Sequence, residues 1–305
     1  MKNRSIMIAA TAIFISLSFV DKVFAGAWTV PKHKVWGEYY MKWDYAKREF
    51  THEGKLKPLT ANARTWEFVQ EPKLEFGVTD WLTALTYMEY KESHYKQDSK
   101  DRPWAGLTDF ARKNHGITSI KVGGRLRFID KPLVVSTQTK VFIYPGYGNY
   151  HGDDPAFTNQ PSIGRGDDAV EQRILIGKSF DLPLPLPWNA EPKVPCYLGA
   201  ETGYRWRTRH VCNDIPYFVE GGLHPVQWLL LKGEVDGYQC HPGTGSIKES
   251  YGIVRVGGVW KVFGGDSIKR EGGKLFNIEF QYGMTLWGKN TTVFQEWILK
   301  VDTQF

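Results

Sequence analysis

From Lys34 onward, apolar and polar residues alternate in stretches of about 10 to 14 residues, separated by Gly, Pro, Asp and Asn. A period of two with little helical periodicity is typical of β-strands. The pattern predicts about twelve strands, over Lys34–Tyr45, Arg64–Phe76, Trp81–Glu92, Gly116–Ile129, Leu133–Tyr144, Ala169–Phe180, Val194–Arg207, Ile215–Gly222, Val226–Tyr238, Lys248–Phe263, Lys274–Thr285 and Val293–Phe305.

The two faces of these strands differ in chemistry, because successive side chains point to opposite sides. One face is apolar and aromatic, and the other carries charges of both signs. A charge on a lipid-exposed face at mid-depth costs about 2–4 kcal/mol, so the charged face should be sheltered inside a barrel. The interior residues predicted in this way are Glu38, Lys42, Glu67, Glu71, Lys121, Arg125, Arg127, Lys140, Glu171, Arg173, Glu201, Arg205, Glu220, Lys232, Glu234, Arg255 and Glu279.

The links between the strands alternate in length. Residues 77–80, 130–132 and 223–225 form short links, and longer polar segments separate them. Transmembrane barrels have short periplasmic turns and longer outer loops, which predicts an antiparallel transmembrane β-barrel with both termini periplasmic. Two links, 181–193 and 264–273, are long where short turns are expected. A soluble β-sandwich would turn the apolar face inward, and strand parity alone does not distinguish the two folds.

The N-terminus has the pattern of a signal peptide. Residues 1–4 carry two positive charges, residues 5–20 are mostly apolar, and Ala25 completes a small-residue cleavage pattern before Gly26. A permanent helical anchor would need roughly 20 apolar residues, and Asp21 interrupts this run too early. We therefore expect residues 1–25 to be a cleaved signal peptide and residues 26–305 to be the barrel.

The last strand ends on an aromatic residue. Trp297, Leu299, Val301 and Phe305 share one face of this strand. This arrangement resembles the C-terminal signal by which bacterial barrels reach their assembly machinery, although an amphipathic edge strand could end in the same way. Together with the signal peptide, it predicts localisation in a bacterial outer membrane, with membrane lipid and the assembly machinery as partners.

Charge and composition narrow the function classes. The formal net charge is +6, and removing Lys2, Arg4, Asp21 and Lys22 leaves about +4. Basic and acidic residues are interspersed along the chain, whereas a nucleic-acid binder concentrates Lys and Arg on one face. We therefore expect no nucleic-acid partner.

The charged interior has two interpretations, an open pore or a salt-bridged filling. Barrels of about twelve strands lie between small filled barrels and wide porins, so strand number does not decide between them. In a pore, Arg125, Arg127, Arg173, Arg205 and Arg255 opposed by Glu67, Glu171, Glu201 and Glu220 would set a transverse field. Such a field favours small polar or zwitterionic solutes.

The search for catalytic and metal-binding patterns gives little. His151 and Asp153 share one predicted outer loop, which suggests a hydrolase at the outer leaflet less strongly than an ordinary solvated loop. Cys212 and Cys240 could form a disulfide, which an oxidising compartment favours, or bind metal with His210 and His241. We expect the disulfide, no metal and no cofactor, and a channel rather than an enzyme.

Three segments resemble a known group of proteins: Gly26-Ala27-Trp28-Thr29-Val30-Pro31-Lys32, Glu75-Phe76-Gly77-Val78-Thr79-Asp80-Trp81-Leu82 and Gly164-Arg165-Gly166-Asp167-Asp168. They are similar to uncharacterised outer-membrane transporters that include the outer-membrane proteins of phenol-degradation meta-pathways. The resemblance implies an outer-membrane channel for small polar or aromatic solutes, and it transfers no functional residue.

Overall fold

The computed structural model describes residues 26–59, 62–97, 110–145, 163–164, 167–185, 187, 193–208, 211–245, 248–264 and 275–305. The predicted signal peptide and the loop containing His151 and Asp153 lie outside these residues. Within the described ranges, no helix is both long and apolar enough to span a bilayer.

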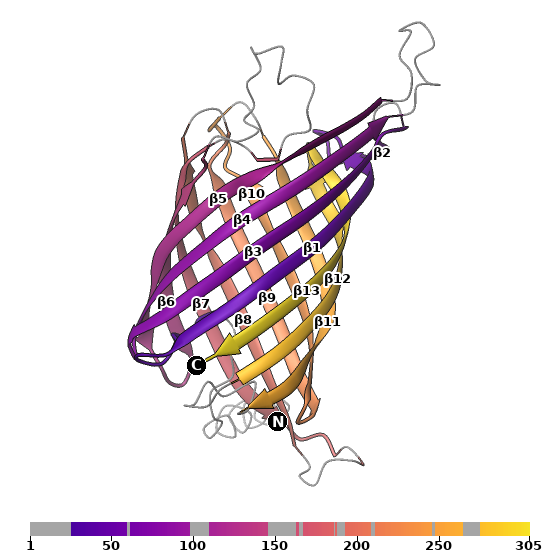
Figure 1. Cartoon of the computed structure of the whole chain (residues 1–305). Coiled ribbons are helices and arrows are strands. Elements are labelled where there is room, and N and C mark those ends of the chain that lie inside the picture. Colours follow the sequence, from indigo (N-terminus) through magenta and orange to yellow (C-terminus); the bar gives the residue numbers. More distant parts are fainter. Residues whose placement is uncertain are drawn as a thin grey trace, which may run out of the picture.

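The alternating segments form one antiparallel sheet that closes into a barrel (Figure 1). Twelve strands make up the wall, and the short strand β2 pairs only with β1. The strands are β1 (Val35–Phe50), β2 (Leu56–Pro58), β3 (Arg64–Thr79), β4 (Leu82–Gln97), β5 (Phe110–Ile129), β6 (Val134–Ile143), β7 (Ala169–Leu182), β8 (Val194–Arg207), β9 (Asp214–Val226), β10 (Leu229–Cys240), β11 (Ser250–Gly264), β12 (Leu275–Lys289) and β13 (Thr291–Gln304).

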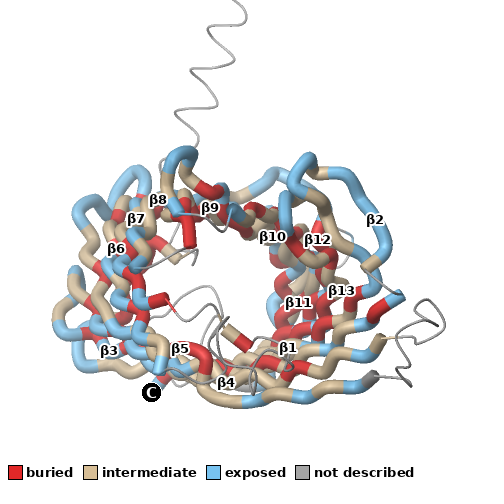
Figure 2. Tube along the Cα trace, turned by 90° about the horizontal axis from the view of Figure 1, so that it is seen from above, coloured by how far each residue is buried: buried red, intermediate tan, exposed pale blue. Residues whose placement is uncertain are grey.

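Closure comes from the pairing of the first wall strand with the last. β1 and β13 pair from Trp36 opposite Gln304 to Phe50 opposite Thr291. Beyond Gln304, Val35 and Phe305 exchange two backbone hydrogen bonds of 2.9 and 3.1 Å. The wall therefore has no free edge, as a structure in lipid requires. Seen from above, its strands form a ring (Figure 2).

The predicted separation of the two faces is confirmed on the outside of the barrel. Large apolar side chains are exposed on the outer face of nearly every wall strand. Among them are Trp43, Trp66, Leu74, Phe76, Val122, Val141, Ile174, Leu198, Val219, Leu231, Val256 and Phe280. A water-soluble protein would bury such a surface, so this outer belt is that of a membrane barrel.

The two ends of the barrel differ in their connections. Residues 80–81, 130–133 and 227–228 make short turns at the end that also holds Val35 and Phe305 (Figure 1). At the other end, β1, β4, β5 and β12 extend four to six residues beyond their predicted limits. On β4 and β5 the sequence pattern missed these extensions because both strand faces are mostly polar there, although the backbone pairing continues. The extension of β12 contains the consecutive apolar residues Leu286 and Trp287, which interrupt the two-residue alternation. Asn290, with a φ of 50°, alone links β12 to β13.

Val256 tests the assignment of the outer face, because it lies near the middle of β11 and its exposed fraction is 59%. Val256→Arg is expected to lower the free energy of unfolding by about 2–4 kcal/mol, because the guanidinium would face hydrocarbon. Urea titration of the protein in lipid vesicles measures this change, with Val256→Leu as the control. Equal stability of the two variants would contradict a lipid-facing position.

Candidate transport lumen

A cavity of about 670 Å³ lies inside the barrel. Charged side chains from β1, β3, β4, β5 and β8–β13 line most of it, together with Trp36, Tyr40, Tyr87, Phe218 and Tyr251. The inward face of each strand supplies these residues because side chains alternate along a strand. The volume suits a small organic molecule, whereas a polymer would need more space.

The N-terminal segment enters the barrel before β1 begins. Ala27, Trp28 and Val30 are almost completely buried. Trp28 belongs to an apolar cluster whose other members are Ala27, Val134, Leu175, Tyr197, Leu230 and Val259. The indole lies so close to Gly177 that any larger side chain there would overlap it. This cluster narrows the barrel interior and borders the charged cavity.

Hydrogen bonds with three neighbouring strands hold this segment in place. Arg125 donates to the Trp28 carbonyl oxygen at 2.9 Å, and Ser136 donates to the carbonyl oxygen of Ala27. The backbone N–H of Val30 donates to Thr83 Oγ1 at 2.8 Å. Because Thr83, Arg125 and Ser136 come from β4, β5 and β6, these three strands together fix the position of the segment.

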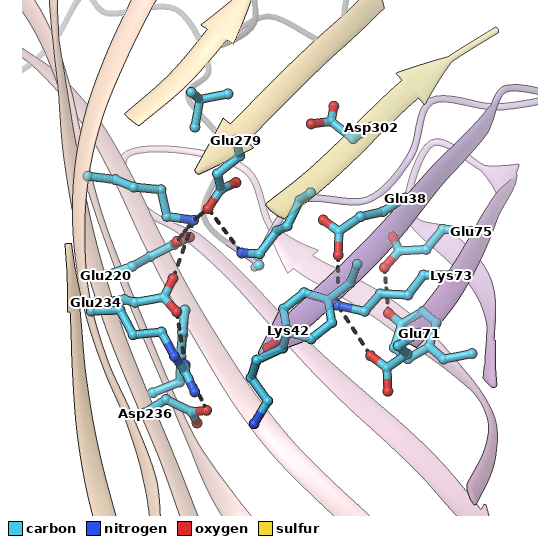
Figure 3. Close-up of a pocket in the computed structure, with 18 of the residues that line it drawn as sticks. Glu38, Lys42, Glu71, Lys73, Glu75, Glu220, Glu234, Asp236, Glu279 and Asp302 are labelled. Atoms are coloured by element: carbon cyan, nitrogen blue, oxygen red, sulfur yellow. Dashed lines mark hydrogen bonds and ion pairs between the residues drawn. The ribbon is translucent and has the colours of Figure 1, made fainter. Parts of the chain in front are cut away.

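One group of charges belongs to β1, β3, β4 and β5 (Figure 3). Lys73 contacts Glu38 at 2.8 Å and Glu71 at 3.3 Å. Lys121 contacts Glu71 and lies 3.0 Å from Glu89. Each lysine therefore bridges two carboxylates, which offsets the cost of holding these charges out of bulk water.

Arg125 connects the wall to the N-terminal segment. Its guanidinium makes two hydrogen bonds of 3.1 Å to the Glu75 carboxylate and two to Gln138 Oε1, at 2.8 and 3.1 Å. Tyr87 donates to the same carboxylate at 2.7 Å. Paired hydrogen bonds of this kind hold a guanidinium in a fixed orientation.

A second group lies on β9–β13. Lys232 contacts Glu220, Glu234 and Glu279 at 3.4, 3.3 and 3.1 Å. Arg255 contacts Glu234 at 3.0 Å and Glu296 at 2.7 Å. Carboxylates outnumber cations here, and this group lines the cavity opposite the Lys73 group (Figure 3).

A third group converges on Glu171, whose side chain is completely buried. Lys140, Arg173 and Arg205 contact its carboxylate at 3.0, 2.7 and 2.5 Å. Arg205 also lies over the ring of Phe142, 4.8 Å from its centroid. One carboxylate thus holds three cations together, and Glu201 and Asp214 supply further counter-charges to Arg173 and Arg205 at 3.2 and 3.4 Å.

The inner charges are segregated by sector. Among the described inner side chains that line the cavity or join these ion pairs, β5–β8 carry six basic and two acidic residues, a balance of +4: Lys121, Arg125, Lys140, Arg173, Arg205, Arg207, Glu171 and Glu201. The other strands carry six basic and thirteen acidic ones, a balance of −7: Lys42, Lys73, Lys91, Lys232, Arg255, Lys300, Glu38, Asp44, Glu67, Glu71, Glu75, Glu89, Asp214, Glu220, Glu234, Asp236, Glu279, Glu296 and Asp302. Four of these thirteen carboxylates, Glu71, Glu75, Glu89 and Asp214, pair directly with cations of β5–β8, so the surplus that remains after pairing is negative and lies on the other strands.

The structure places twelve of the seventeen predicted interior residues in the cavity wall. Lys140, Glu171, Arg173 and Arg205 lie in the Glu171 group beside it, and Arg173 and Arg205 contact Glu171 directly instead of facing it across the lumen. Arg127 is also outside the cavity wall. It donates to the Asp80 carbonyl oxygen at 2.7 Å, at the end of the barrel with the short turns.

Sequence reasoning missed several cavity residues. Lys73, Glu75, Glu89 and Lys91 line the cavity, and continuing the two-residue period along β3 and β4 would have included them. Trp28 carried no comparable signal, because it precedes the first strand.

The remaining predicted residues have defined positions. Cys212, two residues before β9, and Cys240, the last residue of β10, form a disulfide. No group of three or more potential metal ligands occurs within the described ranges. On β13, Trp297 and Phe305 are exposed on the outer face.

A closed twelve-stranded antiparallel wall, an apolar outer belt and a charged interior define a transmembrane β-barrel of the outer-membrane type. The comparisons with known proteins support this class. Among solved structures, an outer membrane channel from Pseudomonas putida F1 aligns with 94% of this chain and 100% of its own length, with a TM-score of 0.61 and 14% sequence identity. The two proteins share a fold, that of a transmembrane β-barrel.

Two further structures align with lower scores. The transport unit of the autotransporter AIDA-I from Escherichia coli has a TM-score of 0.47 at 10% identity, with 96% of each chain covered. The monoaromatic hydrocarbon channel CymD has a TM-score of 0.38 at 8% identity, with 90% of this chain and 88% of CymD covered. No family model and no curated protein sequence matches the chain.

Glu171 tests the role of the ion pairs in stability. Glu171→Gln is expected to lower the free energy of unfolding by about 3 kcal/mol, because Lys140, Arg173 and Arg205 would lose their shared counter-charge. Guanidinium unfolding of the vesicle-embedded protein measures the change. Glu53→Gln, at an exposed loop site, serves as the control and should change stability by less than about 0.5 kcal/mol. Identical midpoints for both variants would exclude this role.

Proposed function

We propose that this barrel is an outer-membrane channel that passes small solutes through its charged lumen. The observation that carries this proposal is the cavity of about 670 Å³ inside a closed membrane barrel, lined by paired charges. A barrel with only a structural role would gain nothing from a cavity of this size, because holding so many charges out of bulk water costs free energy. The fold shared with an outer membrane channel supports the same function.

The lining favours polar solutes with a positive or zwitterionic character. It contains eleven carboxylates and eight basic side chains, a difference of three negative charges. Rings of charged side chains select ions by sign at close range. The ammonium group of such a solute could approach the wall of β9–β13, where carboxylates outnumber cations. Tyrosine and tryptophan side chains in the same wall also provide contacts for aromatic solutes.

A channel explains the lining better than a hydrolase does. The described residues that line the cavity include no histidine and no cysteine, and their carboxylates are held by lysines and arginines. Such neutralised carboxylates are suited to binding and selection rather than to proton transfer.

A filled barrel is the second candidate, and the buried N-terminal segment favours it. Ala27 and Trp28 occupy the interior together with the apolar side chains of the wall. In this alternative the segment would block passage completely and the cavity would end at the cluster.

Planar-bilayer recording distinguishes the two candidates. The channel predicts discrete conductance steps for the wild type and larger steps for Trp28→Ala, because the truncated side chain no longer fills the narrowed interior. Leu198→Ala, on the outer face, is the matched control and should leave the steps unchanged. Silence of the wild type and of Trp28→Ala at all voltages would reject the channel in favour of the filled barrel.

Ion selectivity tests the acidic lining separately. Glu220→Gln with Asp302→Asn removes two of the three surplus negative charges, so the reversal potential in a salt gradient should shift toward weaker cation preference. Glu53→Gln with Asp130→Asn changes the net charge equally, outside the cavity, and should preserve the wild-type reversal potential. The same reversal potential in all three proteins would show that these carboxylates do not face the permeating ions.

A further inference from the structure

The outer face of β1 and β3 carries closely packed aromatic pairs near the end opposite the short turns. Trp43 and Phe68 stack with their ring centroids 5.1 Å apart, and Tyr45 lies 5.5 Å from Trp66. Trp43 and Trp66 are both exposed. Amphipathic aromatic rings on the outside of a membrane barrel mark the level of the lipid headgroups.

Basic residues follow directly beyond these rings. Arg64 lies two residues before Trp66 and is the cross-strand partner of Lys96 on β4. Arg64 and Lys96 are exposed on the same outer face as Trp66 and His94, because residues two apart share a face. Lys47, also exposed, extends over the Tyr45 ring at 5.3 Å. We call Lys47, Arg64 and Lys96 the basic strip.

The basic strip differs in charge balance from the neighbouring outer-face residues Glu92, His94 and Lys113. There, Glu92 on β4 forms an ion pair with Lys113 on β5 and lies 2.7 Å from His94, so a carboxylate neutralises the lysine. Within the described ranges, neither Arg64 nor Lys96 has an ion pair with a carboxylate. Like charges directly opposite each other on adjacent strands repel, and an anion bound between them would remove the repulsion.

The strip is confined to one side of the barrel. Trp206 and Trp287 are exposed on other strands toward the same end, and their cross-strand neighbours are the uncharged residues Val170 and Gly252. At these two positions the aromatic belt continues without a like-charged pair beside it.

We propose that the basic strip binds a phosphate headgroup of the surrounding lipid leaflet. Arg64 and Lys96 are cross-strand partners on one face, so their guanidinium and ammonium groups can reach one phosphate, an interaction that suits arginine in particular. The position next to the aromatic belt favours a phosphate fixed at headgroup depth, such as that of a phosphorylated glycolipid, over a free ion. This site is independent of whether the lumen conducts.

The experiment uses full-length protein expressed in membranes and extracted in mild detergent. Native mass spectrometry measures retained lipid after incubation with bisphosphorylated lipid A or with the same lipid after enzymatic removal of its phosphates. The test variant is Arg64→Gln with Lys96→Gln. The control, Lys131→Gln with Lys193→Gln, removes two exposed lysines at the opposite end. Resistance of each barrel to unfolding in cold dodecyl sulfate verifies that all three proteins are folded.

The wild type and the control should prefer the phosphorylated lipid, and the test variant should bind it roughly thirtyfold more weakly, the factor that two near-surface charges contribute. Equal retention by all three proteins would overturn the proposal, as would equal losses in both variants, which would indicate a general effect of surface charge. A further arm adds millimolar inorganic phosphate. Complete displacement of the lipid would show that the strip binds free phosphate, which contradicts a headgroup site.

Discussion

Pairing of β1 with β13 is the constraint on which the rest of this structure depends. A bilayer offers no water to an unpaired N–H or C=O group, so the sheet must close on itself. Here closure extends to the last residue, where Phe305 and Val35 exchange backbone hydrogen bonds. Once the wall is closed, alternation along each strand leaves a side chain only two environments, the lipid and the lumen. The chemistry of every wall position follows from this division.

The division forces the lumen to neutralise its own charges. Charged residues excluded from the lipid face collect inside, where isolated ions would be costly. The structure meets this cost with shared partners: Lys232 contacts three carboxylates, and Glu171 contacts three cations. Most of these ions are paired locally, and the cavity lining as a whole keeps a surplus of three carboxylates. The stability of the wall therefore depends on these ion pairs.

The sequence predicted the features that follow from local periodicity: the strands, the outer face and most of the charged interior. It could not predict features that depend on long-range pairing. The contact of Arg125 with Glu75 joins residues 50 positions apart, and no periodicity specifies it. Likewise, residues 26–30 have no strand pattern, and their position inside the barrel depends on hydrogen bonds with Thr83, Arg125 and Ser136. The ends of β4 and β5 were underestimated because backbone pairing there outlasts the alternation of apolar side chains.

The N-terminal segment links the shape of the lumen to its electrostatics. Trp28 fills space within the apolar cluster, while its carbonyl oxygen accepts a hydrogen bond from Arg125. Arg125 is therefore held from two sides, by the Glu75 carboxylate that neutralises its charge and by a carbonyl dipole that adds no charge. Displacing the segment would therefore do more than widen the interior. It would also leave Arg125 with fewer partners, which makes a purely steric role for the segment physically incomplete.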